Sequence, residues 1–228
     1  MKKINQSIFK AKDYPPIMTT IVAPVGDSME DIFVTLKQFK VKEVILISPI
    51  EAIGLAEKTR DQIKKKKVPC SIKKITGNIW EEMFKAISEI KQETGEEDII
   101  VNVSTGTKDT RCAATSAAFV NGIKALAVDG EEAMLLPTLK FSYYKLLTDR
   151  KMKLLEILSQ PRCCASLDEL SRKAKMSLPL VSYHIHGNLK SEGLEQLGLI
   201  ETKTVKGRLK INLSMLGRLL LKGYVKSE

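Results

Sequence analysis

Short runs of apolar residues alternate with helical spacings of apolar residues over the first two thirds of the chain. A helix is predicted where apolar residues recur at i, i+4 and i+7, as Ile32, Leu36 and Phe39 do. The run 98–103 is almost continuously apolar, which is typical of a parallel strand covered on both faces. Strands are predicted at residues 20–23, 43–48, 68–75, 98–103 and 123–128, with helices at 29–39, 51–67, 78–90 and 107–121.

Strands that alternate with helices imply right-handed crossovers and a doubly wound sheet. We therefore predict an α/β fold with a Rossmann-like, mainly parallel sheet over residues 18–147. Residues 1–17 precede it as an N-terminal extension, in which Pro15 and Pro16 interrupt the pattern.

From residue 148 onward the pattern changes to short helices followed by a hairpin. Thr148 caps a first predicted helix, and Ser166 opens a second with a capping box. A third helix begins at Ser177, ahead of a Pro that the first turn tolerates. Apolar-polar alternation at 199–203 and 209–213 flanks a glycine turn, and a last helix covers 214–222. This order predicts a C-terminal winged helix-turn-helix domain over residues 148–228.

Composition excludes several classes of protein. The chain has 228 residues, of which 43% are hydrophobic and 28% are charged, enough for a sizeable core. No apolar run approaches the roughly 18 residues that a membrane helix needs, and residues 1–17 do not resemble a secretory signal. The four cysteines lack Cys-x-x-Cys spacing and there are two histidines, so we expect reduced thiols and no metal site. We expect a cytoplasmic protein without a membrane partner.

Positive charge is concentrated in the last third of the chain. Residues 1–148 hold 22 basic and 19 acidic residues, whereas residues 149–228 hold 15 and 8, a net +7. Such an excess favours a polyanionic partner, because each neutralised phosphate releases counterions. A solvated surface is the alternative interpretation of the same charge. The lysine run 64–67 ends a predicted helix, where the helix dipole favours cations, and we assign it no function.

The first candidate site is the segment Val103-Ser104-Thr105-Gly106-Thr107-Lys108, where a buried strand meets a helix. Ligands of open α/β sheets bind beyond the carboxyl ends of the strands, and a helix N-terminus there favours an anion. The segment is not a Walker A loop, because Val101 and Asp109 stand where that motif needs Gly and Ser or Thr. Residues 24–28 follow another strand and are expected at the same sheet edge.

Together these two loops resemble those of the CARF (CRISPR-associated Rossmann fold) family, and Asn102 to Lys108 is a close match to its second loop. The resemblance implies a homodimer that binds a ring of cyclic oligoadenylate on its two-fold axis, with no other cofactor. The ligand-binding residues that it implies are Gly26, Asp27, Ser28, Ser104, Thr105, Gly106, Thr107 and Lys108.

The second candidate site is the helix that begins near Leu178, which resembles the recognition helix of bacterial and archaeal winged-helix regulators. Val181, Ile185 and Leu189 are predicted to face inward. Gly198-Leu199-Ile200 comes 13 residues after Ile185, later than is common in such helices, so this helix is longer or is interrupted at Gly193. The residues expected to contact double-stranded DNA are Ser182, Tyr183, His186, Lys190, Lys206 and Arg208.

The combined resemblance implies a CRISPR-associated, DNA-binding transcriptional regulator of archaeal type that senses a cyclic oligonucleotide. One alternative is a ring nuclease that cleaves cyclic oligoadenylate, in which Ser104, Thr105 and Lys108 would position and stabilise the reacting groups. No histidine lies in residues 1–148, so we name no catalytic residue and expect at most weak cleavage. The other alternative is a constitutive DNA-binding dimer without a ligand. Ring size, operator sequence and the direction of regulation do not follow from the sequence.

Overall fold

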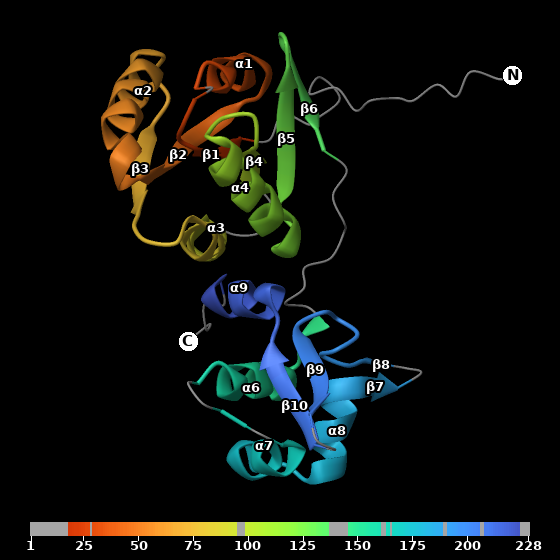
Figure 1. Cartoon of the computed structure of the whole chain (residues 1–228). Helices are drawn as coiled ribbons and strands as arrows, with labels where there is room; N and C mark the ends of the chain where they lie inside the picture. The colour runs from red at the N-terminus through yellow and green to blue at the C-terminus, as the bar shows by residue number, and fades with distance from the viewer. Residues whose placement is uncertain are drawn as a thin grey trace, which may run out of the picture. The chain divides into compact units, whose positions relative to one another are not determined.

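The computed structural model describes residues 18–27, 29–94, 99–136, 146–160, 163–164, 166–188, 191–205 and 208–223. These residues fall into two compact units, an N-terminal unit up to residue 136 and a C-terminal unit from residue 146 (Figure 1). No helix among the described residues is long and apolar enough to span a membrane.

The N-terminal unit is built on a six-stranded sheet in the order β3-β2-β1-β4-β5-β6. The first five strands are parallel and the sixth is antiparallel to β5. This confirms the predicted α/β fold with a mainly parallel sheet. The strands are β1 (Thr19–Pro24), β2 (Val41–Pro49), β3 (Cys70–Ile75), β4 (Ile99–Asn102), β5 (Lys124–Asp129) and β6 (Glu132–Leu135).

Strand β6 was not predicted from the pattern. It has four residues, most of them partly exposed, so its apolar signal is weak. It forms because Gly130, with φ +59°, turns the chain back from Asp129 and pairs Asp129 with Glu132.

Four α-helices and one short 3₁₀ helix connect the strands of the N-terminal unit. Asn78 accepts hydrogen bonds at Oδ1 from the backbone N–H groups of Trp80 and Glu81, which explains why the third helix begins there. The helices are α1 (Asp31–Gln38), η2 (Ile50–Ala52), α2 (Ile53–Lys65), α3 (Ile79–Thr94) and α4 (Lys108–Val120).

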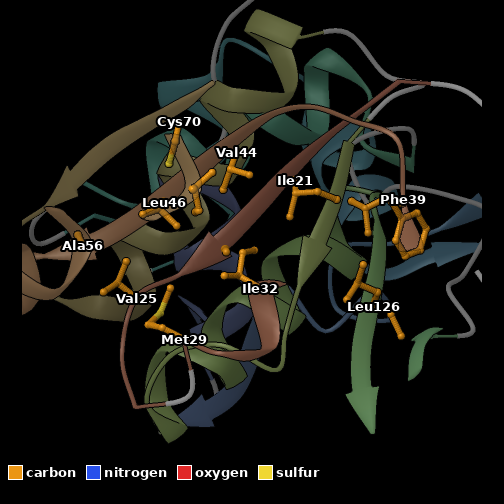
Figure 2. Packing of buried hydrophobic residues seen from close by; sticks show 14 residues of the cluster. Ile21, Val25, Met29, Ile32, Phe39, Val44, Leu46, Ala56, Cys70 and Leu126 are labelled. Atoms are coloured by element: carbon orange, nitrogen blue, oxygen red, sulfur yellow. The ribbon is translucent and has the colours of Figure 1, made fainter. Parts of the chain in front are cut away.

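The two faces of the sheet carry different layers of the core. Residues Ile21 and Ala23 of β1 point to the face where Ile32 of α1 and Ala56 of α2 complete one cluster (Figure 2). The intervening Val22 is also buried and points to the opposite face. Helices α3 and α4 pack against each other, and their inner sides are buried. The sheet is therefore covered on both sides, as a continuous apolar strand requires.

Two expectations about single residues are wrong. Trp80 shares a helical spacing with Met83, Phe84 and Ile87, which predicts a core position for it, but Trp80 is 37% exposed and only the other three are buried. The adjacent Cys163 and Cys164, expected to be reduced, form a disulfide.

The C-terminal unit consists of short helices and two hairpins. Thr148 and Ser166 cap the first two helices with their side-chain oxygens, as the sequence indicated. Strand β9 pairs antiparallel with β10, and β7 pairs with β8. The elements are α6 (Asp149–Leu158), α7 (Leu167–Ala174), α8 (Leu178–His186), β7 (Gly187–Asn188), β8 (Ser191–Glu192), β9 (Ile200–Val205), β10 (Arg208–Leu213) and α9 (Met215–Gly223).

The hairpin of β7 and β8 accounts for the extra residues before Gly198. Gly187 has φ +75° and ends α8, and a Cβ atom on Gly193 would overlap the backbone nitrogen of Gly187. The two glycines thus let the chain turn and pass close to itself. Helix α8 ends at His186, before Gly193, and Leu189 and Lys190, which were predicted to continue its two faces, lie outside the described residues.

His184 on α8 is a buried polar residue of the C-terminal unit. It is only 6% exposed, and neither ring nitrogen has a hydrogen-bond partner among the described residues. Burial lowers the pKa of His184, and the positive charges of Lys151 and Arg150 lower it further. The folded state therefore favours the neutral form of this imidazole.

We predict that the stability of the C-terminal unit falls as pH drops below about 6.5, the ordinary His value. Below that pH, His184 binds a proton in the unfolded chain but not yet in the folded unit, because its folded-state pKa is lower. The free energy of unfolding therefore decreases as the pH falls toward the folded-state pKa. Urea unfolding at pH 7.5 and pH 5.5 tests this. His184→Leu removes the titrating group and should lose less stability over that interval, and an equal loss in both proteins would contradict the prediction.

Candidate ligand site and nucleic-acid interface

The order of the strands reverses between β1 and β4. Strand β1 pairs with β2 on one side and with β4 on the other, and β4 continues to β5. The loops that follow β1 and β4 therefore leave the same edge of the sheet next to each other. In doubly wound sheets, this switch point is where a ligand-binding crevice forms.

The two loops are in direct contact at their backbones. A Cβ atom on Gly26 would overlap the backbone nitrogen of Thr107 and the carbonyl carbon of Gly106. Gly106 has φ +95°, and a Cβ atom there would lie 2.5 Å from Thr110 Oγ1 and 3.1 Å from Pro24 Cβ. Both positions thus require glycine, the first for the close approach and the second also for its left-handed backbone.

The structure brings together most of the residues predicted to bind a ligand, in different environments. Gly26, Ser104, Thr105 and Gly106 are buried, Thr107 is half-buried, and Asp27 and Lys108 are exposed. Ser28 lies outside the described residues.

Two of the predicted hydroxyl groups stabilise the loop itself. Ser104 Oγ accepts a hydrogen bond of 2.5 Å from the backbone N–H of Val128 on β5. Thr107 Oγ1 caps α4 by accepting from the N–H of Thr110 at 3.3 Å. Thr105 Oγ1, by contrast, is fully buried and has no hydrogen-bond partner among the described residues.

Two residues near the loops were not assigned a role from the sequence. Asn102 is buried at the end of β4, donates to Thr35 Oγ1 on α1 at 2.9 Å and accepts from the N–H of Ser104 at 2.9 Å. The sequence could have indicated this role, because Asn102 is a polar residue at the end of an otherwise apolar strand.

Arg111, in the first turn of α4, influences the charge of Asp31 on α1. Burial and Glu30 raise the pKa of Asp31, whereas the positive charge of Arg111 lowers it. Its role depends on how α1 and α4 are arranged, which the sequence does not reveal.

Helix α8 presents the second candidate surface. Val181 and Ile185 are buried, whereas Tyr183 and His186 are exposed and Ser182 is half-buried. His186 Nδ1 lies 2.9 Å from Glu195 Oε2, and Thr202 of β9 donates to Glu195 Oε1. These hydrogen bonds lower the pKa of Glu195, so its carboxylate remains charged and its negative charge lies beside His186. His186 thus ties α8 to β9 and is less available to a phosphate than its exposure suggests.

The hairpin of β9 and β10 places two lysines side by side. Lys203 and Lys210 are directly opposite each other across the two strands, and both are exposed. Like charges at opposite positions of an antiparallel pair repel, and a polyanion would relieve the repulsion. The sequence-based list omitted both residues, because their pairing depends on the register. Arg208 is the first residue of β10, whereas Lys190 and Lys206 lie outside the described residues.

Comparison with known proteins identifies the N-terminal unit. The family model described as "HFX_2341_N:-like, N-terminal" matches residues 19–133, half of the chain. The chain belongs to this HFX_2341_N-like family. The match covers strands β1 to β5 and reaches the start of β6, and it includes both loops of the candidate ligand site. No protein in the curated set matches the chain in sequence.

Solved structures similar to this HFX_2341_N-like chain include one protein activated by cyclic oligoadenylate and one in complex with cyclic tetra-adenylate. One is a type III CRISPR defence DNA nuclease activated by cyclic oligoadenylate, with 16% identity and a TM-score of 0.42 over 53% of this chain and 20% of that one. The second is Can2 from Sulfobacillus thermosulfidooxidans in complex with cyclic tetra-adenylate, with 14% identity and a TM-score of 0.44 over 91% of this chain and 62% of that one.

A third similar structure is protein VC1899 from Vibrio cholerae, with 13% identity and a TM-score of 0.45 over 90% of this chain and 64% of that one. The chain thus spans less than two thirds of the length of each of the three proteins. Similarity at this level does not establish a shared ligand.

We predict that Gly26→Ala destabilises the N-terminal unit by about 1–3 kcal/mol, because the new methyl group overlaps the backbone of the second loop. Gly54→Ala is the matched control, since nothing lies within 4 Å of a Cβ atom there and Gly54 belongs to α2. In a helix, the control substitution should stabilise by up to about 1 kcal/mol. Urea unfolding measures both. Equal stability of the two variants would mean that the loops are not in contact.

Proposed function

We propose that this HFX_2341_N-like protein is a CRISPR-associated, DNA-binding transcriptional regulator whose N-terminal unit is a CARF-type sensor. In this proposal two chains form a dimer through their N-terminal units and bind one ring of cyclic oligoadenylate. The C-terminal unit is a winged helix-turn-helix reader of double-stranded DNA.

One observation carries the proposal: the contacting loops after β1 and β4 at the switch point of the sheet. The second loop opens a helix of 13 residues, whose first backbone N–H groups and dipole favour an anion. Because Gly26 and Gly106 carry no side chains, the two loops pack closely and hold the N-terminus of α4 at the switch point. Lys108, exposed in the first turn of α4, adds a positive charge. Phosphodiesters fit this combination well.

A ring with two-fold symmetry would meet the same loop from each of two chains. A closed dimer presents identical surfaces on both sides of its axis, so each protein group contacts the ring twice. The ligand can change DNA binding only by favouring one arrangement of the dimer over another.

The C-terminal unit supports the DNA-binding part through its order of elements. Helices α6, α7 and α8 are followed by the small β7–β8 hairpin, the β9–β10 hairpin and helix α9. An aromatic residue is exposed on α8, and paired lysines lie on the β9–β10 hairpin. In a winged helix, α8 would enter the major groove and the hairpin would contact the backbone or minor groove.

We predict that Lys108→Ala weakens the binding of cyclic oligoadenylate about ten- to a hundredfold, since a charge-assisted hydrogen bond contributes roughly 1.5–3 kcal/mol. Lys85→Ala is the control, because Lys85 is also exposed but lies on α3. Calorimetry with cyclic tetra- and hexa-adenylate measures affinity and stoichiometry, and we expect one ring per two chains.

Chromatography of the ligand after incubation separates the sensor from the ring nuclease, because a sensor returns the ring intact. Failure of the unaltered protein to bind either ring would refute the proposed ligand. Equal affinity of Lys108→Ala and Lys85→Ala for the ring would remove α4 from the site.

We predict that Lys210→Gln makes the salt dependence of duplex DNA binding less steep by about one unit of slope, the value of one lost phosphate contact. The variant should be as stable as the parent or slightly more stable, because it removes repulsion from Lys203. Lys153→Gln on α6 is the control for the loss of one exposed charge. Fluorescence anisotropy at several salt concentrations gives both slopes, and an unchanged slope for Lys210→Gln would exclude the hairpin from the interface.

A further inference from the structure

Seven exposed lysines gather at the edge of the sheet opposite the candidate ligand site. They occupy the last turn of α1, the start of β2 and the end of α2, and we call them the lysine cluster. Its members are Lys37, Lys40, Lys42 and the run 64–67.

The topology brings these segments together. Helices α1 and α2 both run back from the carboxyl edge of the sheet, so they end where β2 and β3 begin. Val44 of β2 donates to the carbonyl of Pro69, two residues after the lysine run, at 2.9 Å. Lys66 Nζ, just after α2, lies 5.6 Å from the centre of the Phe33 ring in the first turn of α1, so the end of α2 lies against α1. Figure 1 shows α1 and α2 on the same side of β2.

The cluster is not neutralised by the protein. Segments 37–42 and 62–68 contain no Asp or Glu. Of the nearest carboxylates, Asp61 pairs with Arg60 at 3.1 Å, and Glu43 accepts a hydrogen bond from Thr20 at 3.3 Å. None of the seven lysines forms an ion pair with any residue that the structure describes.

Helix-end electrostatics explain only part of the cluster. Lys37, Lys64 and Lys65 lie in last turns, where the helix dipole favours cations. Lys40 and Lys42 flank the start of a strand and Lys67 lies beyond α2, so no helix dipole accounts for them. Residues 1–148 carry a net charge of only +3, so the other surfaces of this unit are net negative. Such a separation of charge costs repulsion within the cluster, which a polyanion would relieve.

We infer that the lysine cluster is a second nucleic-acid surface, one that contacts the phosphate backbone of duplex DNA. Lysines supply compact charges for phosphates without reading bases. Lys65 and Lys66 also line an open pocket of about 500 Å³ with Phe33 and Gln62, which leaves room for a phosphate group. A single strand is disfavoured, because the Phe33 ring is half-buried and Lys66 lies over it, so no aromatic face is open for stacking.

The inference does not depend on the cyclic oligoadenylate or on the winged helix. The lysine cluster and the candidate ligand site lie at opposite ends of the parallel strands, so DNA on one and a small ligand on the other would not compete. In this arrangement the N-terminal unit contributes contacts that are independent of sequence.

The test compares two double variants of the full chain, each of which loses two exposed lysines. Lys65→Gln with Lys66→Gln alters the cluster, and Lys58→Gln with Lys85→Gln is the control at equal net charge. We expect the cluster variant to bind a short duplex roughly tenfold more weakly near 0.1 M salt, with a salt slope less steep by up to about 1.8. The control should change neither quantity appreciably. Thermal unfolding should show the cluster variant to be at least as stable as the control.

Acetylation of surface lysines, read by mass spectrometry, locates the contact separately from the C-terminal unit. Duplex DNA should protect residues 64–67 in the unaltered chain and leave Lys58 and Lys85 reactive. Protection of residues 64–67 would support the inference even if no residue of α8 or the β9–β10 hairpin were protected. The experiment therefore distinguishes failure of this inference from failure of the proposed DNA binding by the C-terminal unit. Equal DNA affinity of the two variants, or protection of the cluster by polyglutamate but not by duplex DNA, would overturn the inference. The second outcome would indicate an acidic protein partner.

Discussion

The absence of a side chain at Gly26 is the constraint on which the candidate ligand site depends. The loop after β1 lies against the backbone of Gly106 and Thr107, at a separation that no Cβ atom allows. This contact unites the ends of two strands that pair at the centre of the sheet but are about 80 residues apart in the chain. It also brings the N-terminus of α4 to the same crevice, so the anion-favouring end of that helix is positioned by packing rather than by any charged residue.

Polar residues around this contact divide into those that build the crevice and those that remain available. The Asn102 side chain donates a hydrogen bond to α1, and the Ser104 hydroxyl accepts one from β5. The Thr107 hydroxyl caps α4. Exposed Lys108 and backbone N–H groups remain for a ligand, and the buried Thr105 hydroxyl has no partner among the described residues. Such a surface suits a phosphodiester, which needs donors and positive charge. It offers no imidazole for acid-base chemistry, because both histidines lie in the C-terminal unit.

A glycine pair shapes the second surface as well. Gly187 and Gly193 end α8 and fold the next residues into a small hairpin, so the exposed face of α8 is limited to residues 178–186. The Glu195 carboxylate then holds His186 and Thr202, which joins α8 to β9. The charge of this unit is consequently presented by the β9–β10 hairpin, where Lys203 and Lys210 are opposed, more than by the helix.

Local patterns in the sequence were sufficient for β1 to β5, the helices between them, the parallel sheet and the caps at Thr148 and Ser166. Each depends on residues within a few positions of one another, whose spacing and hydrogen-bonding capacity are visible in the sequence. Gly106 and Lys108 were also identifiable, because a strand-to-helix loop is a local motif. The contact of Gly26 with Thr107, the pairing of Lys203 with Lys210, the exposure of Trp80 and the gathering of seven lysines were not. Each joins segments whose register or packing is set by the whole sheet or hairpin, and only the tertiary structure decides which distant residues become neighbours.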